Sequence, residues 1–260
     1  MTDWITFVVG QFISGRVFFY GMALCLLGCF LRSFFKKNSI HSLARVSLLI
    51  GVVLVVLSAA PFSLWVYGVY FALLAWTVFR RANGGGQARK PAYHLPLLLF
   101  LAQSFLMVRT EIRYSLPPKI PLARSGTLFV VGDSISMGAD PPGKNWPQLL
   151  GDSAMLKVRN FSFGGAKVES ALDNVRRINQ DDALVILEIG GNDLLGGTSN
   201  PKFRDDLEQM MVLTCGPHRI VAMVELPLPP FCNRYGMVQR AVAKEHGVTL
   251  IPKRFLADVM

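Results

Sequence analysis

The pattern of hydrophobic positions divides the chain into two parts. Residues 1–110 contain four long apolar runs, whereas after residue 126 short apolar runs alternate with amphipathic stretches of helical period. No acidic residue separates the four long runs, which favours membrane-spanning helices over the core of a soluble domain. The four runs are residues 17–31, 46–60, 64–79 and 95–108.

Each run is shorter than the roughly 20 residues that cross a hydrocarbon core. Arg16, Arg32 and Arg80 flank the runs, and their long side chains can extend toward the lipid headgroups and add to the span. A cleaved signal peptide is the alternative for the first run, but no basic segment precedes it and three further runs follow. We therefore expect residues 1–110 to be a membrane region with about four transmembrane helices.

The second part has the pattern of an α/β domain. Residues 111–126 contain three prolines that suit an extended linker, and the domain then covers residues 127–260. Five continuous apolar strands with helices between them predict a doubly wound parallel sheet that is covered on both faces. The predicted strands are residues 127–132, 156–161, 184–189, 219–226 and 248–251, and the predicted helices are residues 145–154, 167–178, 203–214 and 234–245.

The formal net charge of +10 could indicate a nucleic-acid partner, but its distribution argues against one. Basic residues without acids fill the two loops between the first and second runs and between the third and fourth, which marks both loops as cytoplasmic. A multi-pass protein of the bacterial cytoplasmic membrane follows, with residues 127–260 on the outer face. Further basic residues after the last run argue against this orientation. The loop residues are Arg32, Lys36, Lys37, Arg45, Arg80, Arg81, Arg89 and Lys90.

Three polar segments follow the first three predicted strands. They are Gly132-Asp133-Ser134-Ile135-Ser136, the segment 160–165 and the segment 190–193. Each alone is an ordinary turn sequence. The carboxyl ends of parallel strands meet at one edge of a sheet, where ligands bind in open α/β folds. Their joint occurrence at three successive strand ends therefore predicts a functional site.

These segments, "GDSIS", "NFSFGG" and "EIGGND", resemble three sequence blocks of the SGNH hydrolases, also called GDSL esterases or lipases. The similarity covers about residue 127 to the end and is closest to small bacterial thioesterase- and lysophospholipase-like members. It implies a three-layer, flavodoxin-like α/β domain with a five-stranded parallel sheet, and a serine ester hydrolase that forms an acyl-enzyme. Ser134 is then the nucleophile, with the Ser134 and Gly165 N–H groups and the Asn192 side chain as the oxyanion hole.

The same resemblance gives Asp133 and Asp193 supporting roles within the loops, and it implies no metal and no organic cofactor. The substrate is then an acyl ester, either of a lipid or of an O-acetylated glycan. The alternative enzyme is an O-acyltransferase of cell-envelope glycans, in which a sugar hydroxyl replaces water as the acceptor. The sequence leaves the oligomeric state open. Neighbouring apolar side chains either line an acyl groove or simply pack, namely Met137, Phe163, Leu194 and Leu195.

The family's last block, Asp-x-x-His, supplies the base, and residues up to Met260 do not contain it. His41 and His94 fall in the membrane region. His218 and His246 precede strands, so they are expected at the opposite edge of the sheet from Ser134. We expect that the native chain continues past Met260 with this block, and that Asp258 belongs to a helix before it. The alternatives are an inactive SGNH-like binding domain and a hydrolase with only residual oxyanion-hole activity.

Overall fold

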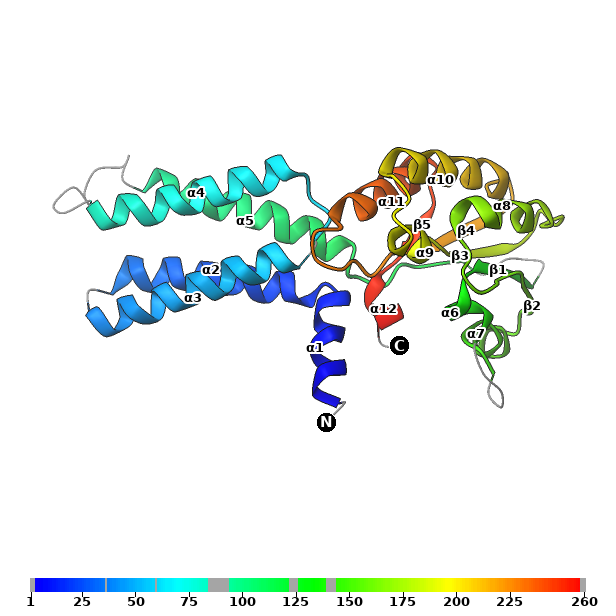
Figure 1. Ribbon diagram of the computed structural model, residues 1–260, viewed down its shortest axis with the longest axis horizontal. Helices are drawn as coiled ribbons and strands as arrows, with labels where there is room; N and C mark the ends of the chain where they lie inside the picture. The colour runs from blue at the N-terminus through cyan, green and yellow to red at the C-terminus, as the bar shows by residue number, and fades with distance from the viewer. Residues whose placement is uncertain are drawn as a thin grey trace. The chain divides into compact units, whose positions relative to one another are not determined.

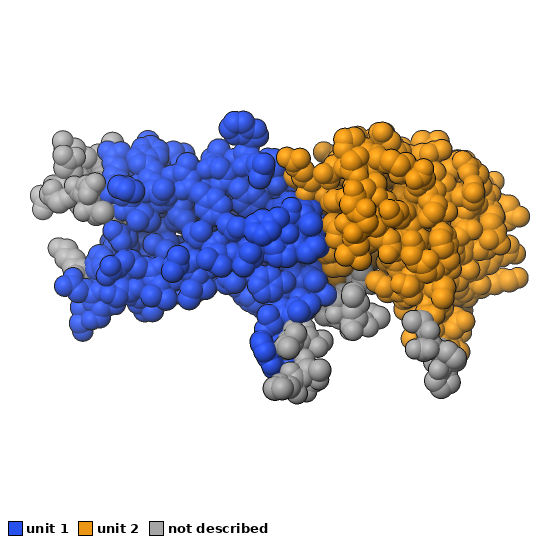
Figure 2. All heavy atoms as spheres, in the orientation of Figure 1, with its two compact units in different colours: residues 1–115, 228–233 blue, residues 116–227, 234–260 orange. Residues whose placement is uncertain are grey.

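The computed structural model describes residues 3–35, 37–58, 60–83, 94–121, 126–138 and 144–257. The chain forms two compact units, drawn in blue and orange in Figure 2. The first unit comprises residues 1–115 with 228–233, and the second comprises residues 116–227 with 234–260. Most of the predicted basic loop around residues 81–91, and the predicted helical position of Asp258, lie outside the described residues.

The first unit is helical, and its four apolar runs are helices as predicted (Figure 1). One further helix, α1, was not expected; Gly15, in the left-handed conformation with φ of 78°, separates it from α2. The bounds are α1 Asp3–Ile13, α2 Arg16–Phe34, α3 Asn38–Leu57, α4 Leu64–Asn83 and α5 Leu95–Arg113.

Helices α2 and α3 pack closely because small residues face each other. A Cβ added at Gly21 would lie 2.8 Å from the backbone nitrogen of Val55, and one at Gly51 would lie 2.8 Å from that of Cys25. Small residues allow helix backbones to approach in this way. Cys25 and Val55 are fully buried in the core of the unit.

Large apolar side chains also cover the outside of the first unit, with Trp65 at 85% and Phe79 at 70% exposure. By length and composition α2, α3 and α5 are each long and apolar enough to cross a membrane, whereas the apolar part of α4, Leu64–Arg80, is shorter. The described helices thus include three candidate spans where the sequence predicted about four.

The second unit contains the five-stranded, all-parallel sheet that the sequence predicted, in the order β2-β1-β3-β4-β5 (Figure 1). Every strand lies within or next to its predicted range. The bounds are β1 Thr127–Gly132, β2 Lys157–Asn160, β3 Leu184–Glu188, β4 Ile220–Val224 and β5 Thr249–Ile251.

Helices lie on both sides of this sheet. Leu128, Val130 and Ile186 point to one side, where they belong to a core cluster that Trp146 and Leu150 of α7 join. Helices α8, α10 and α11 lie together on the other side (Figure 1). Three short helices follow strand ends: α6 after β1, α9 after β3 and α12 after β5. The bounds are α6 Ser134–Met137, α7 Trp146–Ala154, α8 Val168–Arg176, α9 Gly191–Leu195, α10 Asn200–Thr214, α11 Asn233–Glu245 and α12 Lys253–Ala257.

Candidate active site

Ser134 begins α6, two residues after β1 ends, and its side chain is exposed. Asp133 caps this helix, since its Oδ1 accepts a hydrogen bond of 2.9 Å from the backbone N–H of Ile135. Gly132 is required for the turn because an added Cβ would lie 2.6 Å from Ser136 Oγ and 2.8 Å from the backbone oxygen of Glu188. The sharp turn therefore presents Ser134 at the carboxyl edge of the sheet.

The second polar segment is joined to the first by hydrogen bonds. The backbone N–H of Phe163 donates to the oxygen of Gly132 over 3.2 Å, and the Asn160 side chain donates to the oxygen of Ser136 over 2.7 Å. Gly165 is exposed, has a φ of +74°, and would place a Cβ with nothing within 4 Å. A glycine is therefore favoured at this position by the left-handed backbone conformation, and not by a lack of space for a side chain.

The third polar segment reaches both of the others. Asn192 Nδ2 donates to Asp133 Oδ2 over 3.2 Å and to the backbone oxygen of Ala166 over 3.0 Å. The neighbouring Asp193 is buried, and its Oδ2 accepts a bond of 2.9 Å from the N–H of Val168. Burial raises the pKa of Asp193 above its usual value. The two aspartates thus hold the three segments together.

The donors around Ser134 differ in their availability. The backbone N–H groups of Ser134 and Gly165 donate to no other described residue. Asn192 Nδ2 has two hydrogens, and both are engaged with Asp133 and Ala166. Donation from Asn192 to a ligand oxygen therefore requires one of these two bonds to be shared or exchanged.

Sequence reasoning assigned no role to Glu188, although it lies within the "EIGGND" segment. This last residue of β3 is 4% exposed and contacts the Ser134 turn through Ser136 and Asp133. Desolvation, and then the nearby Asp133 carboxylate, raise the pKa of Glu188 to about 8. The available signal was an acid at the end of an otherwise apolar, buried strand.

The structure brings no histidine to this edge within the described residues. His218 precedes β4 and His246 precedes β5, so both lie at the amino ends of parallel strands, as the sequence predicted. His41 and His94 belong to the first unit. Within the ranges that the structure describes, no three His, Cys, Asp or Glu side chains are grouped as metal ligands.

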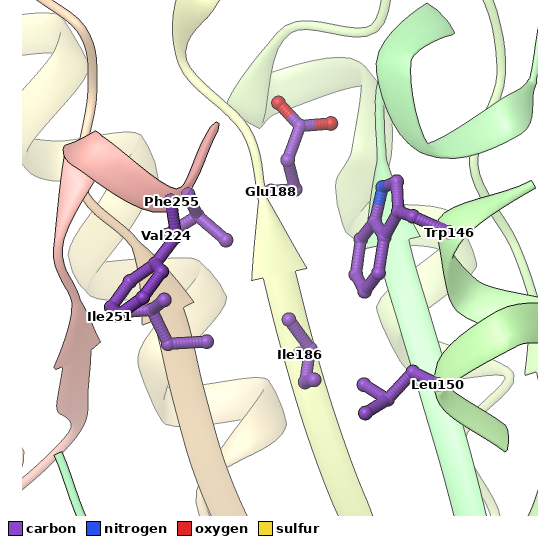
Figure 3. A pocket seen from close by; sticks show the side chains of 7 residues that line it. All are labelled: Trp146, Leu150, Ile186, Glu188, Val224, Ile251 and Phe255. Carbon is purple, nitrogen blue, oxygen red and sulfur yellow. The ribbon is translucent and has the colours of Figure 1, made fainter. Parts of the chain in front are cut away.

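An apolar cavity of ≈ 220 Å³ lies against the sheet, on the side of α7. Figure 3 shows Glu188 at one end of it, with its carboxyl group pointing away from the aliphatic side chains. This cavity is not the groove that the sequence suggested, because neither Met137 nor Leu195 lines it. Met137 is 46% exposed and Leu195 is 82% exposed. The lining residues are Trp146, Leu150, Ile186, Glu188, Val224, Ile251 and Phe255.

Comparison with known proteins places this geometry in a family. The model of the GDSL-like lipase/acylhydrolase family matches residues 130–259, which is half of the chain. Two curated relatives are an arylesterase of Vibrio mimicus, 28% identical over 49% of this chain and 70% of its own, and the esterase TesA of Pseudomonas aeruginosa, 29% identical over 50% and 71%.

Solved structures also match the second part of the chain. The crystal structure of TesA has a TM-score of 0.43 and 29% identity over 48% of this chain and 77% of its own. That of AlinE4, an SGNH-hydrolase family esterase, has a TM-score of 0.44 and 21% identity over 50% and 78%. From the family match and the two esterase relatives we conclude that this chain belongs to the GDSL-like lipase/acylhydrolase family, whose chemistry is the hydrolysis of carboxylic esters.

Proposed function

We propose that Ser134 is the nucleophile of this ester hydrolase and that the N–H groups of Ser134 and Gly165, with Asn192, hold the oxyanion. The observation that supports this most is the joining of three loops around one exposed serine. Asp133 precedes that serine, caps its helix and accepts a hydrogen bond from Asn192. Donors aimed at a developing negative charge commonly contribute the largest single part of such catalysis.

The proposed reaction has two steps. Ser134 Oγ bonds to the carbonyl carbon of the ester, the ester C–O bond breaks, and the leaving alcohol takes up the proton that the serine loses. Water then attacks the acyl-enzyme, which releases the carboxylic acid and restores the serine hydroxyl. The described residues place no histidine at this edge of the sheet.

The substrates we propose are esters of lipids or of O-acylated envelope glycans, reached from a membrane. The support is the exposed apolar surface of α2, α3 and α5, each of which has the length and composition of a span. Multi-pass anchoring in the bacterial cytoplasmic membrane, with residues 127–260 on its outer face, remains part of the proposal. Extraction of the membrane fraction with alkaline carbonate tests the anchoring, since an integral protein stays in the pellet.

A binding domain without turnover is the second candidate. One observation favours it: both N–H groups of the Asn192 amide are already engaged, with Asp133 and with the backbone oxygen of Ala166. Such a domain would hold an acyl ester at the same loops without cleaving it. An O-acyltransferase differs from the hydrolase only in the acceptor that resolves the acyl-enzyme.

Fluorophosphonate labelling of the full chain in detergent micelles separates these candidates. The probe forms a bond between Ser134 Oγ and phosphorus, fluoride leaves, and the serine proton goes to solvent. A hydrolase or an acyltransferase should be labelled stoichiometrically at Ser134, and Ser134→Ala should abolish the label. Replacement of Ser153, an exposed serine on α7, by alanine is the matched control. No labelling of the wild-type serine over hours would refute the nucleophile and favour the binding domain.

If Ser134 reacts with the probe, fresh unlabelled protein then allows the substrate to be tested. Release of acid from a lysophospholipid, from an O-acetylated oligosaccharide and from a short aryl ester is measured side by side, with Ser134→Ala as the blank. Transfer is distinguished from hydrolysis by adding the unacylated oligosaccharide and looking for its acylated product. Faster turnover of the lysophospholipid than of the glycan ester would support lipid esters as the substrate class.

A further inference from the structure

Glu188 is a buried carboxyl group to which the proposed chemistry gives no role. It ends β3 and lies opposite Gly132 of β1 in the register of the parallel sheet. It is also 4% exposed, although an isolated buried carboxylate is strongly disfavoured. A group held at such a cost directly behind the Ser134 turn needs a physical reason.

The hydrogen bonds of Glu188 reach both sides of Ser134. Its Oε2 accepts a hydrogen bond of 2.8 Å from Ser136 Oγ and one of 3.3 Å from the backbone N–H of Asp133. Ser136 is fully buried, and its backbone oxygen accepts from the Asn160 side chain. Through one oxygen atom, Glu188 therefore fixes the residue before Ser134 and the residue two positions after it.

The surroundings of Glu188 oppose its negative charge. On the cavity side it faces Trp146 and apolar side chains from α7, β3, β4, β5 and α12, with no cation among the lining residues (Figure 3). On the turn side it faces Asp133, whose carboxylate already accepts bonds from Ile135 and Asn192. One buried site thus contains two carboxyl groups, and such pairs favour the state in which one keeps its proton.

Three of the other charged groups on or next to the packed elements have partners other than Glu188. On α7, Asp152 forms an ion pair with Lys144, and beyond β4 the carboxylate of Glu225 lies 2.6 Å from Arg240. On α12 the guanidinium of Arg254 lies 4.5 Å from the ring centre of Phe255. The remaining ones are Lys253 on α12 and Lys157 and Arg159 on β2, none of which lines the cavity.

We propose that Glu188, in its protonated form, is a positioning residue for the nucleophile turn, and that loss of its proton in mildly alkaline solution slows acylation of Ser134. The neutral acid donates its proton toward Asp133 while accepting from the turn, so the carboxyl pair has a single negative charge. Ionisation adds a second negative charge behind the turn, which repels Asp133 and the oxyanion that forms on the substrate beside the Ser134 N–H. This inference rests on the proposed role of Ser134.

The test compares labelling rates of the full chain in micelles between pH 6 and pH 9.5 for wild type, Glu188→Gln and Glu169→Gln. The introduced glutamine is neutral at every pH, and Glu169 is an exposed acid on α8 that serves as the control. We expect the ratio of the Glu188→Gln rate to the wild-type rate to rise several-fold from pH 6 to pH 9.5. The ratio for Glu169→Gln should stay constant. A flat ratio for Glu188→Gln would overturn the inference, since a purely structural role lowers the rate equally at every pH.

Backbone hydrogen exchange of residues 130–137 decides the inference even if Ser134 is never labelled. Ionisation of Glu188 should lower the protection of this segment above pH 8 in wild type, after correction for the intrinsic pH dependence, and not in Glu188→Gln. Equal protection profiles in the two proteins would overturn the positioning role. Absence of labelling together with the expected exchange profile would refute the nucleophile while leaving the carboxyl pair supported.

Discussion

Replacement of Glu188 by glutamine should change how the stability of the second unit depends on pH. The pKa of Glu188 is about 8 in the folded chain, against a usual value of 4.5. The folded state therefore binds a proton more tightly than the unfolded state, so stability is full below pH 4.5 and falls as pH rises to about 8. At 1.36 kcal/mol per pH unit, the difference between the two pKa values corresponds to a loss of at most about 5 kcal/mol in the free energy of unfolding.

That magnitude is large beside the roughly 5–15 kcal/mol by which domains are usually stable. The side chain of the introduced glutamine has no proton to lose, so the variant should lack this decline. The two proteins differ only at residue 188, so the difference between their stability curves reports on this side chain. The difference between the two curves should therefore appear between pH 4.5 and 8 and level off above it.

The assay is chemical denaturation of the full chain in micelles, followed by tryptophan fluorescence. Trp146 is the single tryptophan of the second unit, so replacing Trp4, Trp65 and Trp76 by phenylalanine isolates its signal. Denaturation midpoints are measured at half-unit steps from pH 4.5 to pH 9. Parallel pH curves for wild type and Glu188→Gln would refute the raised pKa and the shared proton on which the reasoning depends.

Three further outcomes are expected. Asn192→Ala should lower the labelling rate of Ser134 about 10²- to 10³-fold if its amide is an oxyanion donor; a loss below threefold would contradict that role. Gly165→Ala should lower the free energy of unfolding by about 1–2 kcal/mol, because alanine is strained at a φ of +74° although its Cβ would meet no other atom; an unchanged free energy of unfolding would argue against the left-handed conformation. Arg240→Met should destabilise the second unit by about 3–5 kcal/mol because it leaves the buried Glu225 without the guanidinium of its ion pair. Adding Glu225→Gln to this variant should restore part of the lost stability; equal stability of the single and the double variant would contradict a buried charge on Glu225.

The sequence was sufficient for all five strands and for the helices of the four long apolar runs. Continuous apolar runs of strand length, such as residues 127–132 and 184–189, predicted β1 and β3 because strands that are buried on both faces have no polar side to display. The four long runs likewise predicted helices. The sequence missed α1, α6 and α9, the last two of which have only four or five residues. It expected a helix at Asp258, which the described helix α12 directly precedes. Segments this short have no complete hydrophobic period and depend on the strand ends that they follow.

For the site, the sequence determined which loops meet but not the bonds between them. Three polar segments after successive strands had to converge, since parallel strands end at one edge. Only the tertiary structure placed Asn192 against Asp133, and only it gave Glu188 contacts with Ser136 and the Asp133 N–H, across more than 50 positions of sequence. The pKa of a carboxyl group depends on its burial and on nearby charge, and both arise from packing that sequence spacing does not specify.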